Sequence, residues 1–168
     1  CPEGAPGGAG RAVLMRRRPG GEPEAATPEE TNVRTRVHEY GGGAWRLVEP
    51  DLFLFVEFAD QRIYRQRLGE EPVAISPEPP SPGALRYADL RPTQDGLGVV
   101  CVRERDVEGG EPVNEIVMLP LDGSTGPRVQ ASGRDFYSFP RLSPDGEWLA
   151  WTCWDHPHMP WVGTELWV

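Results

Sequence analysis

Short apolar runs recur along the chain, and each leads through an aspartate to a second, more polar run. The runs "LFLFV", "LGVVCV" and "EWLAW" lead in this way to Asp60, Asp106 and Asp155. The copies are about fifty residues apart, which lies within the range of propeller-type repeats. Because one such unit cannot bury its apolar face alone, we expect neighbouring copies to stack on one another.

Equivalent apolar positions set the register of this repeat. Ile63, Ile116 and Leu166 are 53 and 50 residues apart, and Leu14 precedes Ile63 by 49. The pattern predicts an all-β protein, a partial β-propeller of about three four-stranded antiparallel blades. The first copy begins halfway through its repeat and the last ends inside the run "TELWV", so we expect a fragment truncated at both ends.

The repeat also predicts how residues 1–168 are divided. A half blade covers residues 11–27, complete blades cover residues 36–77 and 85–132, and an incomplete blade covers residues 135–168. In the first complete blade, "GGAWRLVE" is the predicted inner strand, followed outward by "DLFLFVEF", "QRIYRQR" and "PVAIS". The continuous run "LFLFV" is typical of a strand buried on both faces, whereas the alternating "RIYRQRL" is typical of a strand nearer the edge.

The incomplete blade carries much of the aromatic content. Trp148, Trp151 and Trp154 fall in it, and a buried aromatic side chain covers on the order of 150–250 Å². We expect their surfaces to lack packing partners, so that the 168-residue chain aggregates or stays partly unfolded.

Composition narrows the class of protein. The 20 glycines and 19 prolines interrupt every window with helical apolar spacing, so no substantial helix is predicted. The net charge of −9 disfavours nucleic acid and an anionic membrane as partners. Three cysteines without metal spacing, no charged-then-apolar leader and no apolar run near membrane length favour a cytoplasmic protein. A true N-terminus upstream of Cys1 would hide a signal peptide.

No complete active site, cofactor site or metal site is predicted. "EYGGGAW" is Gly-rich, but a phosphate loop needs a lysine and a helix, and the chain has no lysine; residues 41–43 are expected to let an inner strand enter beside a crowded axis. Cys153, His156 and His158 in "CWDHPHMPW" are too few for a zinc site. No serine lies in a G-x-S-x-G turn.

Six motifs, spread over nearly the whole chain, carry a family resemblance. They are "VRTRVHEYGGGAW", "FADQRIYRQ", "RYADLRP", "EPVNEIV", "DFYSFPRLSPDGEWLAW" and "WDHPHMPWVGTELWV". In this order they resemble the N-terminal β-propeller of prolyl oligopeptidase-family serine peptidases, most closely the bacterial acylaminoacyl-peptidase and dipeptidyl aminopeptidase-like branch. "RVHEYGGGA" together with the last motif is specific, whereas "SPDG" alone occurs in many propellers.

The resemblance implies a whole enzyme in which a C-terminal α/β-hydrolase domain, absent from this chain, follows the propeller and holds the Ser, Asp and His of the triad. It implies a serine exopeptidase or oligopeptidase whose non-catalytic propeller caps the active site and gates access. The implied partners are a short peptide substrate and the intramolecular hydrolase domain. The chain itself is assigned no catalytic residue. The candidates for lining a substrate channel are Arg36, His38, Glu39, Tyr40 and Asp155.

Two other classes of function remain open on the sequence. The first is a non-catalytic propeller that binds a partner protein. The second is a glycan-processing enzyme, in which two of Glu39, Glu57, Asp60 and Asp155 would act as the acid–base pair. A reading frame that continues past Val168 for some three hundred residues and contains a G-x-S-x-G would favour the peptidase over both.

Overall fold

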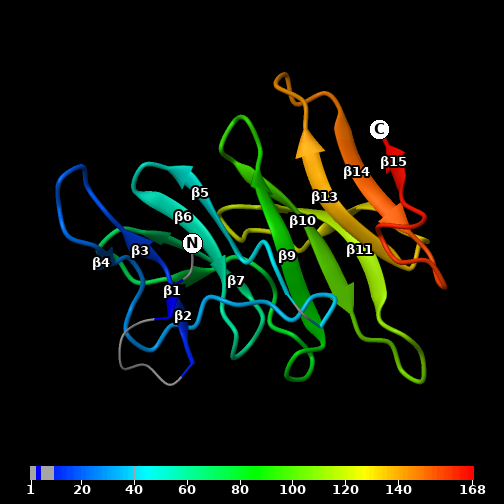
Figure 1. Ribbon diagram of the computed structural model, residues 1–168, viewed down its shortest axis with the longest axis horizontal. Coiled ribbons are helices and arrows are strands. Elements are labelled where there is room, and N and C mark those ends of the chain that lie inside the picture. The colour runs from blue at the N-terminus through cyan, green and yellow to red at the C-terminus, as the bar shows by residue number, and fades with distance from the viewer. Residues whose placement is uncertain (1–2, 5–9, 40) are drawn as a thin grey trace.

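The computed structural model describes residues 3–4, 10–39 and 41–168, which form β-strands and turns without a helix. The strands make five antiparallel sheets: two with four strands, one with three and two with two. Figure 1 shows the sheets following one another as a fan from the N-terminal to the C-terminal end. The prediction of an all-β partial propeller is confirmed. Within the described residues, no helix has the length and apolar character needed to cross a membrane.

The first blade runs outward in the order β5-β6-β7-β8. Its strands are β5 (Trp45–Glu49), β6 (Leu52–Val56), β7 (Ile63–Arg67) and β8 (Val73–Ala74). Ile63 pairs with Val56, so the apolar position of the repeat opens the third strand of this blade.

The second blade has the same order, β9-β10-β11-β12. Its strands are β9 (Leu85–Pro92), β10 (Gly98–Arg105), β11 (Val113–Pro120) and β12 (Arg128–Ala131). Here Ile116 pairs with Val102. This blade therefore repeats the pairing of the first.

The third blade contains β13 (Phe136–Leu142), β14 (Leu149–Trp154) and β15 (Glu165–Trp167), paired in that order. Leu166 of β15 pairs with Thr152 of β14. The three apolar positions of the repeat thus occupy the third strand of all three blades.

Two small sheets precede the first blade. In one, β1 (Glu3–Gly4) pairs with β2 (Ala12–Val13), and in the other β3 (Met15–Arg16) pairs with β4 (Glu24–Ala25). Leu14, between β2 and β3, packs against the first blade. These strands lie in and just before the predicted half blade, residues 11–27.

The core lies between the blades, and the central strand β10 shows why. Val99 and Cys101 point into the cluster shared with the first blade, whereas Val100 and Val102 point into the cluster shared with the third. Alternate side chains of a strand leave opposite faces of its sheet. A central strand between two neighbouring sheets is therefore apolar at every position, and this produces the continuous runs in the sequence.

Side-chain turns close the inner hairpins. The Asp95 Oδ1 atom accepts the Leu97 backbone N–H at 3.0 Å, and Gly96 between them has φ +69°. Asp145 forms the same turn fifty residues later. Such Asx turns, followed by a glycine in the left-handed region, make the "QDG" and "PDG" sequences effective hairpin formers.

The structure corrects two expectations. The inner strand of the first blade begins at Trp45 rather than within residues 41–43, because all three glycines have positive φ, which is incompatible with a strand. Trp154 does not expose its ring: it is 4% exposed and stacks on Phe136, with the ring centroids 5.3 Å apart. Trp148 is 61% exposed, as expected.

Candidate functional site

The inner strands of the three blades lie side by side. Strand β9 contacts both β5 and β13, and each of the three is the first strand of its own sheet. In a propeller the first strands surround the central axis. Side chains on these strands are therefore the ones nearest to anything that passes along the axis.

Two of the inner strands are bulged at the same position of the repeat. In β9, Asp89 and Leu90 interrupt the pairing with β10, and in β13, Phe139 and Pro140 interrupt the pairing with β14. Asp89 has φ +55° and Phe139 has φ +54°, a left-handed conformation that is costly for residues other than glycine. Bulges of this kind turn a side chain away from the regular sheet direction.

The Asp89 side chain of β9 lies between the segment that leads into β5 and the bulge of β13. Its Oδ2 atom accepts the Phe139 backbone N–H at 3.1 Å. On the other side, Gly43 lies so close that a Cβ there would be 2.5 Å from the Asp89 Oδ1 atom. Asp89 therefore occupies the contact between the entry to β5 and the bulge of β13.

Each inner strand carries an arginine at an equivalent position of the repeat. Arg46 pairs with Leu54, Arg91 with Val100 and Arg141 with Ala150. These partners lie two residues before Val56, Val102 and Thr152, the residues that face the apolar positions of the third strands. We call Arg46, Arg91 and Arg141 the arginine triad.

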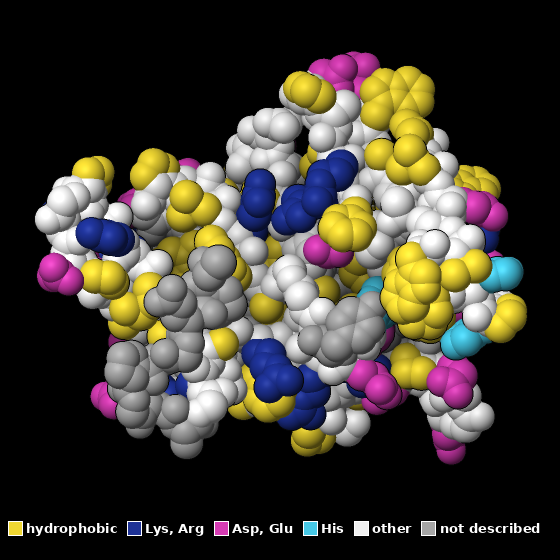
Figure 2. Space-filling view, viewed as in Figure 1, with side chains coloured by type: hydrophobic (Ala, Val, Ile, Leu, Met, Phe, Trp, Pro, Cys, Tyr) yellow, Lys and Arg dark blue, Asp and Glu magenta, His cyan; other side chains and the backbone are white. Residues whose placement is uncertain are grey.

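The charges of the arginine triad act on one another. Burial lowers the pKa of Arg91, and the positive charges of Arg141 and Arg46 lower it further, while Asp89 opposes them. Arg91 is half-buried and the other two are exposed. Figure 2 shows basic side chains gathered over the region between β5, β9 and β13.

Local contacts hold two of the triad side chains in place. The Arg91 Nη1 atom donates to the Leu90 carbonyl at 2.9 Å, and the Arg141 Nη1 atom donates to the Pro140 carbonyl at 2.8 Å. The Arg141 guanidinium also lies 5.5 Å from the centre of the Phe139 ring. Arg46 lines an open polar groove of about 390 Å³ between β5 and the Thr93–Gly96 turn. Among the residues that the structure describes, no carboxylate forms an ion pair with any member of the triad.

The predicted channel candidates of the segment before β5 lie in different surroundings. The Arg36 guanidinium is 4.3 Å from the centre of the Phe58 ring, beside the first blade. Glu39 is exposed, with φ +62°, and its backbone N–H donates to the Arg36 carbonyl at 2.9 Å. Tyr40 lies outside the described residues.

His38 reaches across to the second and third blades. Its backbone N–H donates to the Glu104 Oε1 atom at 2.7 Å, and its ring packs edge-on against Phe136 and Trp154. The pKa of His38 is lowered from its ordinary value, because the effect of burial outweighs the opposing negative charges of Glu104 and Asp89. These contacts tie the segment to the ends of both blades.

Asp155 is engaged in a turn. Its Oδ2 atom accepts from the Arg134 guanidinium at 2.7 Å, and its Oδ1 atom accepts the Asp135 backbone N–H at 2.8 Å. The repeat aspartate of the second blade, Asp106, likewise pairs with Arg86 at 2.8 Å. The recurring aspartates of the second and third blades thus each pair with an arginine, whereas Asp60 accepts from the Arg62 backbone and the Tyr64 hydroxyl.

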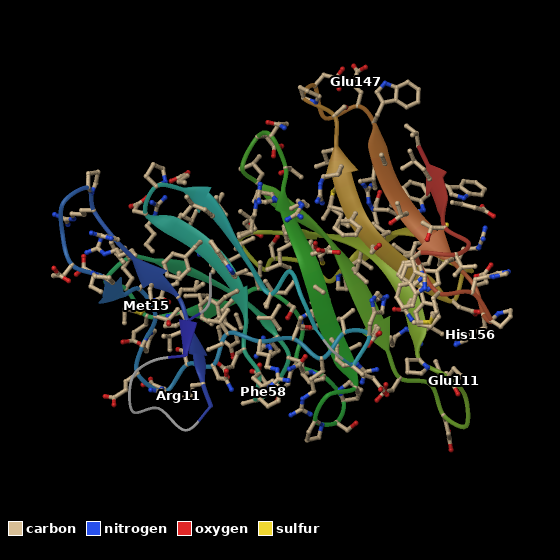
Figure 3. The ribbon with its side chains drawn as sticks, viewed as in Figure 1. Arg11, Met15, Phe58, Glu111, Glu147 and His156 are labelled. Atoms are coloured by element: carbon tan, nitrogen blue, oxygen red, sulfur yellow. The ribbon has the colours of Figure 1, made fainter. Side chains whose placement is uncertain are left out.

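The predicted candidates do not all converge on one point: His38 packs against Trp154, the residue before Asp155, whereas Arg36 lies against Phe58. Phe58, against which Arg36 lies, and His156, which bonds to Asp135 next to the Asp155 turn, are at separate places in Figure 3. Among the described residues, no three His, Cys, Asp or Glu side chains gather as metal ligands would.

The arginine triad was missed by the sequence prediction, although the sequence held a signal for part of it. Arg91 and Arg141 are fifty residues apart, in the matching motifs "ADLRP" and "SFPRL". This recurring basic position is the part of the repeat that points to the triad.

Several solved structures are similar to this chain. A puromycin-hydrolyzing peptidase of Mycobacterium tuberculosis is 37% identical, with a TM-score of 0.84 over 94% of this chain. A puromycin hydrolase is 38% identical with a TM-score of 0.84, and a serine-to-alanine variant of puromycin hydrolase, complexed with PGG, is 38% identical with a TM-score of 0.85. No protein-family model and no curated protein matches the chain.

These similarities agree with the family resemblance in the sequence. The fold defines a portion of a β-propeller with antiparallel blades. More particularly, the chain matches the N-terminal propeller region of prolyl oligopeptidase-family peptidases. It spans 26% of the length of each of the three proteins above.

Proposed function

We propose that this chain is the non-catalytic propeller portion of a serine peptidase that acts on short peptides. In this proposal the propeller covers a hydrolase active site carried by another part of the protein and restricts which molecules reach it. The observation that carries the proposal is the match of 94% of the chain, at 37–38% identity, to peptidases of which it covers a quarter. The finer assignment, to acylaminoacyl- or dipeptidyl aminopeptidase activity, rests on the sequence motifs alone.

The experiment starts from the natural reading frame that contains the chain. We expect it to continue past Val168 for about three hundred residues and to include a G-x-S-x-G turn. The whole protein should release the chromophore from aminoacyl or acyl-aminoacyl p-nitroanilides, and a serine-directed phosphonate should abolish this activity. The 168-residue chain alone should be inactive. A reading frame without a hydrolase, or activity that the phosphonate leaves intact, would refute the proposal.

Under this proposal the predicted channel residues fall into two groups, those free to contact a substrate and those held by the fold. Arg36 and Glu39 expose their side chains and are suited to meet a substrate, whereas Asp155 is held by Arg134. We therefore expect Arg36→Gln in the whole protein to change KM more than thermal stability. A fall in the melting temperature with KM unchanged would remove Arg36 from the substrate path.

A further inference from the structure

An acidic chain in which three neighbouring arginines form no ion pair with any described carboxylate has a site suited to an external anion. The chain carries 26 acidic residues and 17 arginines, and other arginines of the blades, such as Arg86, Arg103 and Arg134, do form ion pairs. Of the carboxylates near the triad, Glu49 and Asp95 line the groove beside Arg46, but Glu49 pairs with Arg67 and Asp95 is bonded to Thr93 and Leu97. Asp89 is bonded to the backbone of β13. It is therefore fixed in the structure rather than closed over the guanidinium groups.

The triad is also held in a geometry that favours binding. Arg91 and Arg141 each use one guanidinium nitrogen on a neighbouring carbonyl, which fixes the planar group and leaves its other nitrogens available. Guanidinium groups held in this way bind carboxylates with two parallel hydrogen bonds, and little conformational entropy is lost. The repulsion among the three positive charges is relieved when an anion enters between them.

We propose that the arginine triad binds a carboxylate group of a short peptide as it passes along the inner strands. This inference rests on the proposed function for the identity of the ligand as a peptide. A peptide offers a carboxylate in two places, its C-terminus and the side chain of an acidic residue. Because Arg46, Arg91 and Arg141 occupy equivalent positions on three blades, their positive charges are arranged around the axis rather than on one blade.

The test measures binding to the whole protein that contains the chain by fluorescence anisotropy of four dye-labelled peptides. Tetra-alanine with a free C-terminus is compared with its C-terminal amide. An amidated peptide containing glutamate is compared with the same peptide containing glutamine. We expect at least one carboxylate peptide to bind about tenfold more tightly than its neutral counterpart, as one charge-assisted contact provides.

Substitutions then assign this preference to the triad. Arg91→Gln, and separately Arg46→Gln on the exposed edge of β5, should each reduce the preference for the carboxylate severalfold. Arg128→Gln makes the same charge change on the exposed outermost strand β12 and should leave it unchanged. Equal binding of carboxylate and neutral peptides, or equal effects of the triad and Arg128 variants, would overturn the inference.

The outcome also separates the inference from the proposed function. Hydrolysis without a carboxylate preference would leave the peptidase standing and refute the triad site. A triad-dependent carboxylate preference without any hydrolysis would support the site and refute the peptidase. If Arg91→Gln lowers the melting temperature, the Arg46→Gln variant decides, because the Arg46 side chain is exposed.

Discussion

The second and third blades share a sequence pattern and a strand order but differ sharply in burial. Ile116 in β11 is fully buried, whereas Leu166, fifty residues later at the equivalent place in β15, is 71% exposed. In the central strands, Val99 to Val102 of β10 are buried, while the first four residues of β14 are only half-buried. The second blade has a blade packed on each of its faces, and the described third blade contacts the second on one face.

This difference shows that burial in a blade is determined by its neighbours more than by its own residues. The third blade is as apolar as the second, with "LAWTCW" and "TELWV" as its central runs. Its exposed apolar side chains include Trp148, Trp161 and Trp167. Exposed apolar side chains of this kind favour association, so we expect the isolated 168-residue chain to self-associate despite its net charge of −9.

The largest effect should come from truncating the equivalent apolar residues. Ile116→Ala should lower the free energy of unfolding by about 2–5 kcal/mol, because it leaves a cavity between two blades. Leu166→Ala should change it by no more than about 0.5 kcal/mol, as is usual for an exposed side chain. Urea denaturation of both variants measures the difference. Similar losses would mean that both faces of the third blade are covered in solution.

The second-largest effect on stability should come from removing one partner of an ion pair. Arg103 and Glu115, at the paired positions of β10 and β11, have side chains only 11% and 8% exposed. Glu115→Ala should lower the free energy of unfolding by about 3 kcal/mol, because the Arg103 guanidinium stays buried without its partner. Glu165→Ala in the third blade removes a more exposed partner of Arg134, and we expect a smaller loss. Equal losses in urea denaturation would contradict the comparison.

Acid should weaken the third blade through Asp135. The backbone N–H of His156 and then its ring hold the pKa of Asp135 below its usual value. A carboxylate with a lowered pKa stabilises the fold above its unfolded-state pKa, and this stability is lost as the pH falls through the folded-state pKa.

The tryptophans report this loss, since all of them except Trp45 lie in the third blade. We expect their fluorescence to change as the pH falls from about 5 to 2. Asp135→Asn should make the folded protein less stable at neutral pH and its stability less dependent on pH in this range. An unchanged pH profile in this variant would exclude Asp135 as the responsible group.

The smallest effect is a difference in thiol reactivity. Cys101 and Cys153 are both buried, and burial raises the pKa of both thiols, so each reacts only when its blade opens. In a Cys1→Ser background, we expect an aromatic disulfide reagent to modify Cys153 about tenfold faster than Cys101, because opening the third blade exposes less buried surface. The Cys153→Ser variant isolates the slower thiol. Faster reaction at Cys101 would reverse the order of local stability.

The sequence could predict the parts of this structure that depend on period and turn chemistry. Ile63 and Ile116 recur at third strands because each faces a neighbouring blade, and Asp95 recurs as Asp145 because each hairpin needs the same turn. The turns depend only on neighbouring residues, and the apolar positions recur at a constant spacing. Each can therefore be recognised from spacing alone.

The candidate site depends on how neighbouring blades pack against each other, and the spacing of residues in the sequence does not predict this packing. Arg46 and Arg91 belong to different sheets and become neighbours only when β5 packs beside β9. The left-handed conformation of Asp89 could not be expected, because the usual signal for positive φ is a glycine. Trp154 is buried because His38, from the segment before β5, packs edge-on against the ring that also stacks on its cross-strand partner Phe136. The spacing of the strands does not predict the contact with His38.

The contact between Gly43 and Asp89 separates two properties that are usually treated as one, surface exposure and tolerance of mutation. Gly43 is exposed to solvent and belongs to no apolar cluster, so a burial criterion would rank it among the freely variable positions. Its φ of +59° already disfavours any side chain, and a Cβ would lie 2.8 Å from the backbone nitrogen of Asp89. In a library of all single substitutions, position 43 should be as depleted as a core position. Position 42 should be less depleted, because its φ of +128° also disfavours a side chain but no atom lies within 4 Å of the place of a Cβ.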